Sequence, residues 1–278
     1  MKALDLTTIG EAGSKDFIRV NKNDSLHNLI REMWRRGKDR ALVYSDDVPE
    51  GIVTQKDVIA RVASSRSYRS PTSTIHVASV MTYPLIKLPE GTSVVKAARV
   101  MLERGISSIP AEKGGDVVAL FSKWDLARML VDSEEPVTTV MTARVVFVND
   151  SDSLPHVRRL MIDQGISVLP VVNPEKNCVV GVITPTELMN ALVEAVDKLS
   201  EGGLKDFLKR VTAGDMMRPL IPAVAPDDSV GKASNLIVEK SVRGVLVMEE
   251  GSVIGIVTLT DLTKYVTYRA VSPSGTYA

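Results

Sequence analysis

Along the chain, apolar residues at helical spacing alternate with short continuous apolar stretches. In residues 26–33 and 94–101 the apolar side chains fall at i, i+3, i+4 and i+7, which is the spacing of one helix face. A short extended apolar stretch precedes each run. Two further apolar runs around a polar turn follow it, which predicts a β-hairpin. A second helix is predicted after the hairpin, so the pattern indicates a β-α-β-β-α unit.

The same order of elements occurs four times. Each predicted first helix follows a serine, and each second helix begins within a seven-residue motif, here called the heptad. The heptads are GIVTQKD at 51–57, ALFSKWD at 119–125, GVITPTE at 181–187 and GIVTLTD at 255–261. Ser25 precedes Thr54 by 29 residues, and the corresponding intervals from Ser93, Ser153 and Ser229 are 29, 31 and 29 residues. Such agreement identifies four copies of one unit.

The four copies are expected to pair, because three strands and two helices bury only a small core. The predicted fold class is α/β (α+β), with the first module at 1–131 and the second at 132–270. Residues 131–139 are the predicted linker, and 194–214 are predicted to contain an additional helix. The terminal segment 271–278 is predicted to be disordered.

Composition argues against several classes of protein. The 278 residues include 34 basic and 34 acidic side chains, and this balance argues against broad adhesion to nucleic acid or an anionic membrane. The single cysteine, Cys178, lies in the apolar run CVVGVI and is predicted to be a small core residue. No apolar stretch is long enough to span a bilayer, and residues 1–13 lack the apolar core of a signal peptide. A cytoplasmic location is expected.

The heptad has two interpretations. A hydroxyl followed three residues later by an acid, at a strand-to-helix junction, is the pattern of a capping box, which contributes about 1 kcal/mol. The same junction also suits a phosphate group, because a helix N-terminus offers unpaired N–H groups and a positive dipole end. A carboxylate one turn into the helix can accept from both hydroxyls of a ribose. Sequence alone leaves both interpretations open.

The paired pattern Gly-apolar-x-Thr/Ser-x-x-Asp resembles the cystathionine-β-synthase (CBS) domain family over about residues 15–270. Two such repeats form a Bateman module, and four in one chain are similar to the regulatory γ subunits of AMP-activated protein kinase. The resemblance implies a non-enzymatic energy-sensing protein that binds AMP, ADP or ATP between paired repeats. S-adenosylmethionine is a less favoured ligand. The implied partners are the nucleotide, a regulated protein of unknown identity and a second copy of the chain in a homodimer.

The resemblance also implies which residues contact the nucleotide. The hydroxyls near phosphate and the aspartates on ribose are Thr54, Asp57, Ser122, Asp125, Thr258 and Asp261. The residues expected to line the base are Ile52, Leu120, Ile256, Ile18, Ile86, Val146 and Pro222, with Ile106 and Ile166 as additional contacts. Arg40 is expected either to face phosphate or to be one more surface charge.

The third heptad departs from the family pattern because Glu187 replaces the aspartate. Its longer side chain moves the carboxylate by roughly 1.5 Å. Thr184 and Glu187 are therefore predicted to cap the helix first and to contact ligand only second.

The sequence contains few candidates for a metal-binding or catalytic site. His27, His76 and His156 lie in different repeats without metal-ligand spacing, and no phosphate-binding glycine loop or catalytic motif is present. Met33, Met101 and Met161 share one helical position and are predicted core residues. No catalytic residue and no metal are expected. The alternatives to a sensor are a structural scaffold, whose heptads only cap helices, and a nucleic-acid adaptor that uses the basic segments 31–40 and 64–74.

Overall fold

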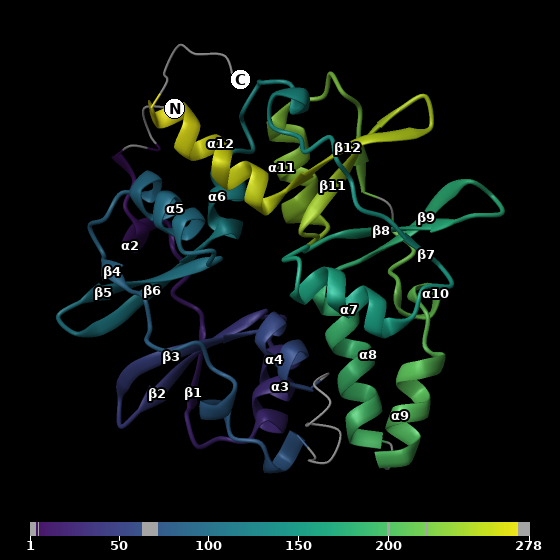
Figure 1. The fold of residues 1–278 in the computed structure, drawn as a ribbon. Coiled ribbons are helices and arrows are strands. Elements are labelled where there is room, and N and C mark those ends of the chain that lie inside the picture. The colour runs from purple at the N-terminus through teal and green to yellow at the C-terminus, as the bar shows by residue number, and fades with distance from the viewer. Residues whose placement is uncertain (1–3, 5, 63–71, 199–200, 221, 272–278) are drawn as a thin grey trace. The chain divides into compact units, whose positions relative to one another are not determined.

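The structure is a computed structural model that describes residue 4 and residues 6–62, 72–198, 201–220 and 222–271. Its strands form four three-stranded sheets (Figure 1). In each sheet the first strand pairs in parallel with the middle strand, which pairs antiparallel with the third. The predicted β-α-β-β-α unit is confirmed in all four repeats.

The elements of each repeat have the following bounds. The first repeat contains β1 (Ile18–Asn21), α3 (Leu26–Arg35), β2 (Arg40–Ser45), β3 (Val48–Thr54) and α4 (Gln55–Val62). The second contains β4 (Leu88–Pro89), α5 (Val94–Glu103), β5 (Ser108–Lys113), β6 (Asp116–Ser122) and α6 (Lys123–Met129). The third contains β7 (Val148–Asn149), α7 (Leu154–Ile162), β8 (Leu169–Asn173), β9 (Cys178–Ile183) and α8 (Pro185–Lys198). The fourth contains β10 (Ala223–Val224), α11 (Val230–Glu239), β11 (Gly244–Glu249), β12 (Ser252–Thr258) and α12 (Leu259–Val271).

Further short elements lie between the repeats. They are α2 (Ile9–Ala12), η2 (Thr72–Thr74), η3 (Val77–Ser79), η4 (Val137–Thr139), α9 (Glu201–Arg210) and α10 (Ala213–Met216). Helix α9 confirms the additional helix predicted within 194–214. The expected linker at 131–139 contains η4, so part of it is a helical turn. The tail at 272–278 and the connector residues 63–71 lie outside the described residues.

The serines that mark each repeat stand at the N-cap of its first helix, and three of them make a side-chain cap. Ser25, Ser93 and Ser229 accept a hydrogen bond from the backbone N–H three residues on, at 3.0–3.3 Å. Ser153 holds the N-cap position of α7, where Pro155 lies in the first turn. These caps start the helices at the register that turns their apolar faces inward. The shared methionine position is core as predicted: Met33, Met101 and Met161 are all buried.

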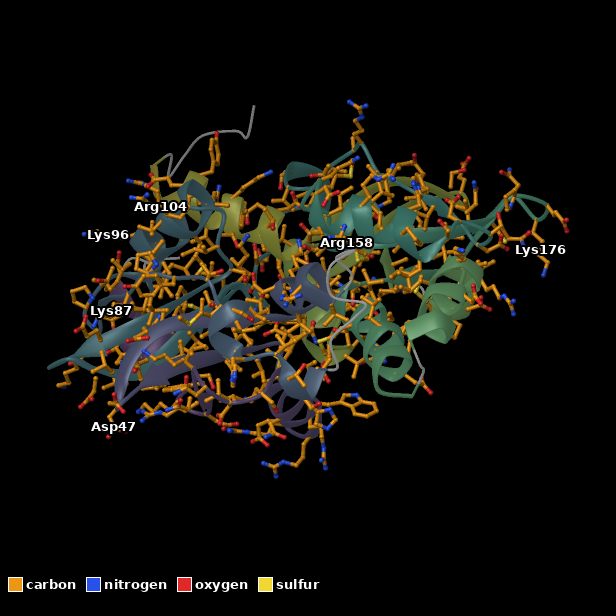
Figure 2. All side chains as sticks on the ribbon, turned by 60° about the horizontal axis from the view of Figure 1, so that its bottom comes forward. Asp47, Lys87, Lys96, Arg104, Arg158 and Lys176 are labelled. Carbon is orange, nitrogen blue, oxygen red and sulfur yellow. The ribbon has the colours of Figure 1, made fainter. Side chains whose placement is uncertain are left out.

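Two sequence predictions need correction. The predicted first strands shorten to two residues in the second, third and fourth repeats, because only those residues pair with the middle strand. Cys178 is exposed rather than core, because it begins β9 at the turn end of the hairpin and pairs with Asn173. Figure 2 shows Lys176 at the tip of this hairpin and Asp47 at the tip of the β2–β3 hairpin, which confirms the predicted polar turns.

The repeats are grouped in two compact units. Unit 1 contains residues 1–16, 86–145 and 221–278, and therefore the second and fourth repeats. Unit 2 contains residues 17–85 and 146–220, and therefore the first and third repeats. In unit 1 α12 packs against α5 and α6, and in unit 2 α4 packs against α8 and α7. Helix packing thus groups alternate repeats, whereas the modules expected at 1–131 and 132–270 group sequential ones; those modules stay a prediction.

Each repeat is preceded by a segment that packs on the neighbouring repeat. These four lead-in segments are residues 8–14, 76–82, 136–142 and 212–218. The first lies on the second repeat and the second on the first repeat, through the bridges of Ser14 with Leu120 and Thr82 with Ile52. The third lies on the fourth repeat and the fourth on the third repeat in the same way. Sequential repeats therefore exchange their lead-in segments.

Candidate functional site

The four heptads form capping boxes at the ends of the third strands. Both the backbone N–H and the hydroxyl of Thr54 donate to Asp57 Oδ2, at 2.8 and 2.7 Å. Ser122 and Asp125 are bonded in the same way, at 2.8 and 2.7 Å, as are Thr258 and Asp261, at 2.9 and 2.5 Å. The capping interpretation is confirmed for these heptads, and it uses one carboxylate oxygen in each.

The third heptad also caps its helix. The N–H of Thr184 donates to Glu187 Oε2 at 2.9 Å, and the Thr184 hydroxyl donates to the same oxygen. The predicted cap is therefore present. The longer side chain of Glu187 bends back far enough to reproduce the carboxylate contact of the aspartates. The hydroxyl is used differently, because Thr184 Oγ1 accepts from the N–H of Thr186 at 3.2 Å, whereas Thr54 and Thr258 accept from the N–H of the acid itself.

The heptads differ in the donors that bind the second carboxylate oxygen of the acid. Asp125 Oδ1 accepts from Arg128 Nη1 at 2.7 Å, and Asp261 Oδ1 accepts from the Thr142 hydroxyl at 2.9 Å. Lys264 Nζ also lies 3.9 Å from Asp261 Oδ1. Within the part of the chain that the structure describes, no donor reaches the second oxygen of Asp57 or of Glu187.

The helix N-termini offer fewer open N–H groups than the sequence led us to expect. In three of the repeats the first N–H of the second helix donates to the carbonyl of the residue before the middle strand. The pairs are Gln55 with Asp39, Lys123 with Ser107 and Leu259 with Arg243, at 3.0–3.1 Å. In the third repeat this position is Pro185, which has no N–H. Any anion at these junctions would depend on side chains as well as on the backbone.

The two variable positions of the heptad connect alternate repeats, a role that sequence reasoning missed. In unit 2 the Thr186 hydroxyl donates to Gln55 Oε1 at 3.1 Å, and Lys56 Nζ donates to the carbonyl of Gly165 at 3.0 Å. In unit 1 Lys123 Nζ donates to the Thr260 hydroxyl at 3.1 Å. The two heptads of each unit therefore meet at their helix N-termini.

The predicted base-lining residues of the heptads pair with the lead-in segments. Ile52 exchanges two backbone hydrogen bonds with Thr82, at 2.8 and 3.2 Å. Leu120 does so with Ser14 and Ile256 with Thr142, and the side chains of both are buried. A signal for this pairing exists in the sequence, since V-x-x-V-M-T occurs at both 77–82 and 137–142.

The remaining apolar candidates occupy different environments. Ile18 is buried on β1, and Pro222 is buried just before β10. Ile86 and Val146 precede the shortened strands β4 and β7; Ile86 is half-buried and Val146 is exposed. Both Ile106 and Ile166 are half-buried in the loop before a middle strand. Their contact with a base stays a prediction.

Arg40 opens β2 as predicted, but it is not a surface charge. Its side chain is only 7% exposed, and it makes a bidentate contact with Asp39, with Nε–Oδ1 at 2.6 Å and Nη2–Oδ2 at 2.8 Å. The surface alternative is wrong because this ion pair holds the guanidinium in the structure. Its orientation toward a phosphate stays a prediction.

Family models identify the repeats. The model described as the CBS domain matches residues 9–64, 77–132, 137–194 and 213–268. The chain belongs to the CBS domain family. Each match begins at a lead-in segment, so the family unit includes the segment that packs on the neighbouring repeat.

Relatives of this chain are found in archaea. The uncharacterized protein MJ1404 of Methanocaldococcus jannaschii is 26% identical over 93% of this chain, which spans only 61% of that protein. The L-aspartate semialdehyde sulfurtransferase of the same organism is 26% identical over 48% of this chain, and the match covers 25% of that enzyme. The crystal structure of MJ1225, described as a candidate archaeal homologue of the γ subunit of AMP-activated protein kinase, has a TM-score of 0.82 at 20% identity. That match covers 93% of this chain and 99% of MJ1225 and shows a shared four-repeat fold.

Other candidate chemistry is limited. Among the described residues, no group of three or more His, Cys, Asp or Glu side chains could hold a metal ion. His27 lies 3.4 Å from the Thr72 hydroxyl, and His76 contacts the carbonyl of Asn23 at 2.8 Å. None of the helices in the described part of the chain combines the length and hydropathy needed to cross a membrane.

Proposed function

We propose that this protein is a non-catalytic sensor that binds an adenosine nucleotide through the aspartates of its heptads. The proposal rests on one observation: the two carboxylate oxygens of Asp57 are used differently. Its Oδ2 accepts both capping hydrogen bonds, whereas its Oδ1 is not used by any described residue. Capping and ligand binding are therefore compatible, because each needs a different oxygen of one carboxylate.

The family relationship supports the same function. MJ1225, which shares the four-repeat fold, is described as a candidate homologue of an AMP-activated kinase subunit. The preferred ligands are AMP, ADP and ATP, ahead of S-adenosylmethionine. A regulated partner protein and a homodimer belong to this proposal. Enzymes such as the sulfurtransferase match this chain over only a quarter of their length, so the repeats correspond to a minor part of those enzymes.

The nucleic-acid adaptor has less support. In the segment 31–40, Arg35 and Arg36 both pair with Glu32, at 2.8 and 3.8 Å, and Arg40 pairs with Asp39. Intramolecular carboxylates therefore satisfy much of the basic charge that would contact a phosphate backbone.

The proposal is tested with Asp57→Asn in the full chain. The asparagine oxygen can keep both capping hydrogen bonds, while its NH₂ group replaces the open oxygen and cannot accept from a ribose. Calorimetric titration with AMP is expected to show weaker binding by about 10-fold or more, since a hydrogen bond to a charged group contributes about 1.5–3 kcal/mol. Melting temperature without ligand should change little.

Asp215→Asn is the matched control. Thr212 and Asp215 form a capping box of the same geometry, at 2.9 Å for both donors, in a lead-in segment rather than a heptad. This variant should bind AMP like the unmodified protein. If millimolar AMP, ADP, ATP and adenosine all leave calorimetry and melting temperature unchanged in the unmodified chain, the sensor function is wrong and the scaffold is favoured.

A further inference from the structure

The first repeat exposes a tryptophan at a helix position that is half-buried in the other three repeats. Trp34 lies on α3, nine residues after Ser25, and is 71% exposed. The residues at the same distance from the serines of the other repeats are also apolar, but all three are half-buried: Leu102, Ile162 and Val238. Tryptophan is enriched where proteins bind other proteins, so its exposure here indicates an interaction surface.

The surface around Trp34 is basic. Arg31 lies one turn earlier on the same helix face and is exposed. Arg35 and Arg36 follow Trp34, and both pair with Glu32, the one acid in this part of the helix. Three arginines against one glutamate leave this end of α3 positively charged. A partner that covers Trp34 should therefore present acidic side chains beside an apolar one.

The chain itself has such a surface at the tip of the β2–β3 hairpin. Val48 is 59% exposed there. Asp46 and Asp47 lie beside it, are exposed, and pair with no other described residue. Figure 2 shows Asp47 at the end of this hairpin, away from the helices. In the part of the chain that the structure describes, no other hairpin tip has an exposed large apolar side chain. The tip therefore complements the end of α3 in charge and in apolar surface.

The two surfaces lie at opposite ends of the first repeat. Strands β1 and β2 are parallel, so α3 runs back along them and ends near the start of β2. Trp34 is therefore at the starting end of β2, and the hairpin tip is at its other end. The six residues of β2 separate these ends by roughly 17 Å, at about 3.3 Å per residue. Two copies lying antiparallel would bring each Trp34 to the tip of the other copy, which is the reciprocal contact of a two-fold dimer.

The two longer segments outside the described residues do not match the basic surface. Residues 63–71 contain Arg66 and Arg69 but no acid, and residues 272–278 contain no charged side chain. Neither segment offers the negative charge that this end of α3 favours. A second copy of the chain does offer it.

We propose that the chain forms a two-fold dimer in which Trp34 and Arg31 of each copy bind the tip of the β2–β3 hairpin of the other. The proposal assigns a surface to the homodimer of the proposed function, and it rests on that function only for the dimer, not for nucleotide binding. Trp34 packs against Val48 and supplies most of the affinity. Arg31 pairs with Asp46 and Asp47 at the rim, where charge pairs determine orientation more than affinity.

Sedimentation equilibrium of the full chain tests the apolar contact, at concentrations from about 1 to 100 µM. Trp34→Ala should raise the dissociation constant of the dimer at least about 10-fold, because a buried tryptophan is a typical interface hot spot. The side chain is exposed within one copy, so the melting temperature of the dilute protein should change little.

Charge reversal tests the reciprocal contact. Arg31→Glu places like charges in both contacts of the dimer, and so does Asp46→Lys/Asp47→Lys. Each variant alone should be monomeric, because like charges at an interface are strongly unfavourable. An equal mixture of the two variants should dimerise again, because both contacts then join opposite charges.

The other repeats provide matched controls for the charge reversals. Arg99 is exposed at the position of α5 that corresponds to Arg31, and Glu249 and Glu250 are exposed at the tip of the β11–β12 hairpin. Arg99→Glu and Glu249→Lys/Glu250→Lys should dimerise like the unmodified chain.

Three results would overturn the proposal. A dimer that survives Trp34→Ala, or one that the mixed charge variants do not re-form, uses another surface, although the homodimer itself then stands. An unmodified chain that stays monomeric excludes both, and if Arg31→Glu then weakens binding to DNA, α3 contacts nucleic acid instead. Titration with AMP separates these results from the sensor function, because none of the substituted residues lies in a heptad.

Discussion

The second repeat and the fourth repeat lie in the same unit but fill one contact in opposite ways. In the fourth repeat the heptad begins with Gly255, and a methyl group there would lie 2.7 Å from Met141 Sδ of the lead-in segment. In the second repeat the heptad begins with Ala119, and the lead-in segment has Gly13, where a methyl group would lie 3.1 Å from the Ala119 methyl. The glycine has changed sides, and the residue that faces it is alanine in the second repeat and methionine in the fourth.

The first and third repeats follow the fourth. Methyl groups on Gly51 and Gly181 would each lie 2.8 Å from the sulfur of Met81 and Met217, respectively. None of these heptad glycines has a positive φ, so backbone conformation does not require them. The comparison teaches that the heptad glycine is present because a lead-in segment packs closely on it. In each contact one side is a glycine, which leaves room for the side chain on the other side.

The largest effect is expected where the contact is made by backbone atoms. In Gly13→Ala the new methyl would lie 2.7 Å from the carbonyl oxygen of Ile9 and 3.0 Å from Phe121 N, and neither atom can move freely. The free energy of unfolding should fall by about 1–3 kcal/mol in urea denaturation. The double variant Gly13→Ala/Ala119→Gly should recover part of this loss, because it restores space on the other side.

Gly91→Ala is the control for this experiment. Nothing lies within 4 Å of a methyl group there, and its φ is not positive. Its unfolding free energy should be unchanged or slightly higher. If Gly13→Ala is equally harmless, the close approach of the lead-in segment is not what excludes a side chain.

A smaller effect is expected on the other side of the comparison. Gly255→Ala presses on Met141 Sδ and Cγ, which belong to a flexible side chain that can rotate away. We expect a loss of about 1 kcal/mol, at the low end for overpacking. A double-mutant cycle with Met141→Ala should show a coupling energy of at least about 0.5 kcal/mol. Additive effects of the two substitutions would mean that these side chains do not share one space.

The segment before the fourth repeat also binds its unit through the side chain of Glu135. The backbone carbonyls of Glu135 and Thr7 accept equivalent bonds from the helices α11 and α5. The side chain of Glu135 also binds the unit: it accepts from the hydroxyls of Tyr265 and Ser133 and pairs with Arg269. Tyr265→Phe should lower the unfolding free energy by about 1 kcal/mol, because it removes one hydrogen bond from a buried tyrosine. Equal melting temperatures of Tyr265→Phe and the unmodified protein in thermal denaturation would exclude a role for the Glu135 contact.

The smallest effect concerns pH. Burial tends to raise the pKa of Glu135, but hydrogen bonds from Tyr265 and Ser133 and the charge of Arg269 outweigh it, so its pKa is lowered. A carboxyl group whose pKa is lower in the folded state stabilises the fold above its unfolded pKa, about 4.3 for glutamate. That stability is lost as pH falls through the lower folded pKa. Between pH 5 and pH 3, Glu135→Gln should therefore lose less stability than the unmodified protein in urea denaturation.

The sequence was sufficient to predict what depends on local pattern. The amphipathic helices that follow each serine, the hairpins and the four heptads follow from spacing and residue type, and all are present. The burial of Arg40 was not predictable, because its partner Asp39 lies in the same polar run and either residue could face water. Cys178 shows the same limit: an apolar run predicts a strand, but not which end of it lies at the exposed turn.

The candidate site was predicted less completely than the fold. The hydroxyl and acid of each heptad could be located, but not how the second oxygen of each acid is used. Arg128 is a local partner and was within reach of helix periodicity. Thr142 is not, because its contact with Asp261 depends on a lead-in segment that lies 119 residues earlier in the chain. The grouping of alternate repeats was not predictable either. All four repeats have the same pattern of apolar helix faces, so the pattern does not show which helices pack together.

The exchange of lead-in segments determines when each repeat can finish folding while the chain is being translated. When the ribosome has made the first repeat, Ile52 on the edge strand β3 still lacks its partner, since Thr82 has not yet been translated. The segment that preceded the first repeat must in turn wait for Leu120. Neither repeat can finish folding before both have been made. A gene segment that encodes one repeat would therefore specify an incomplete fold. The smallest segment whose duplication gives a complete fold encodes two consecutive repeats.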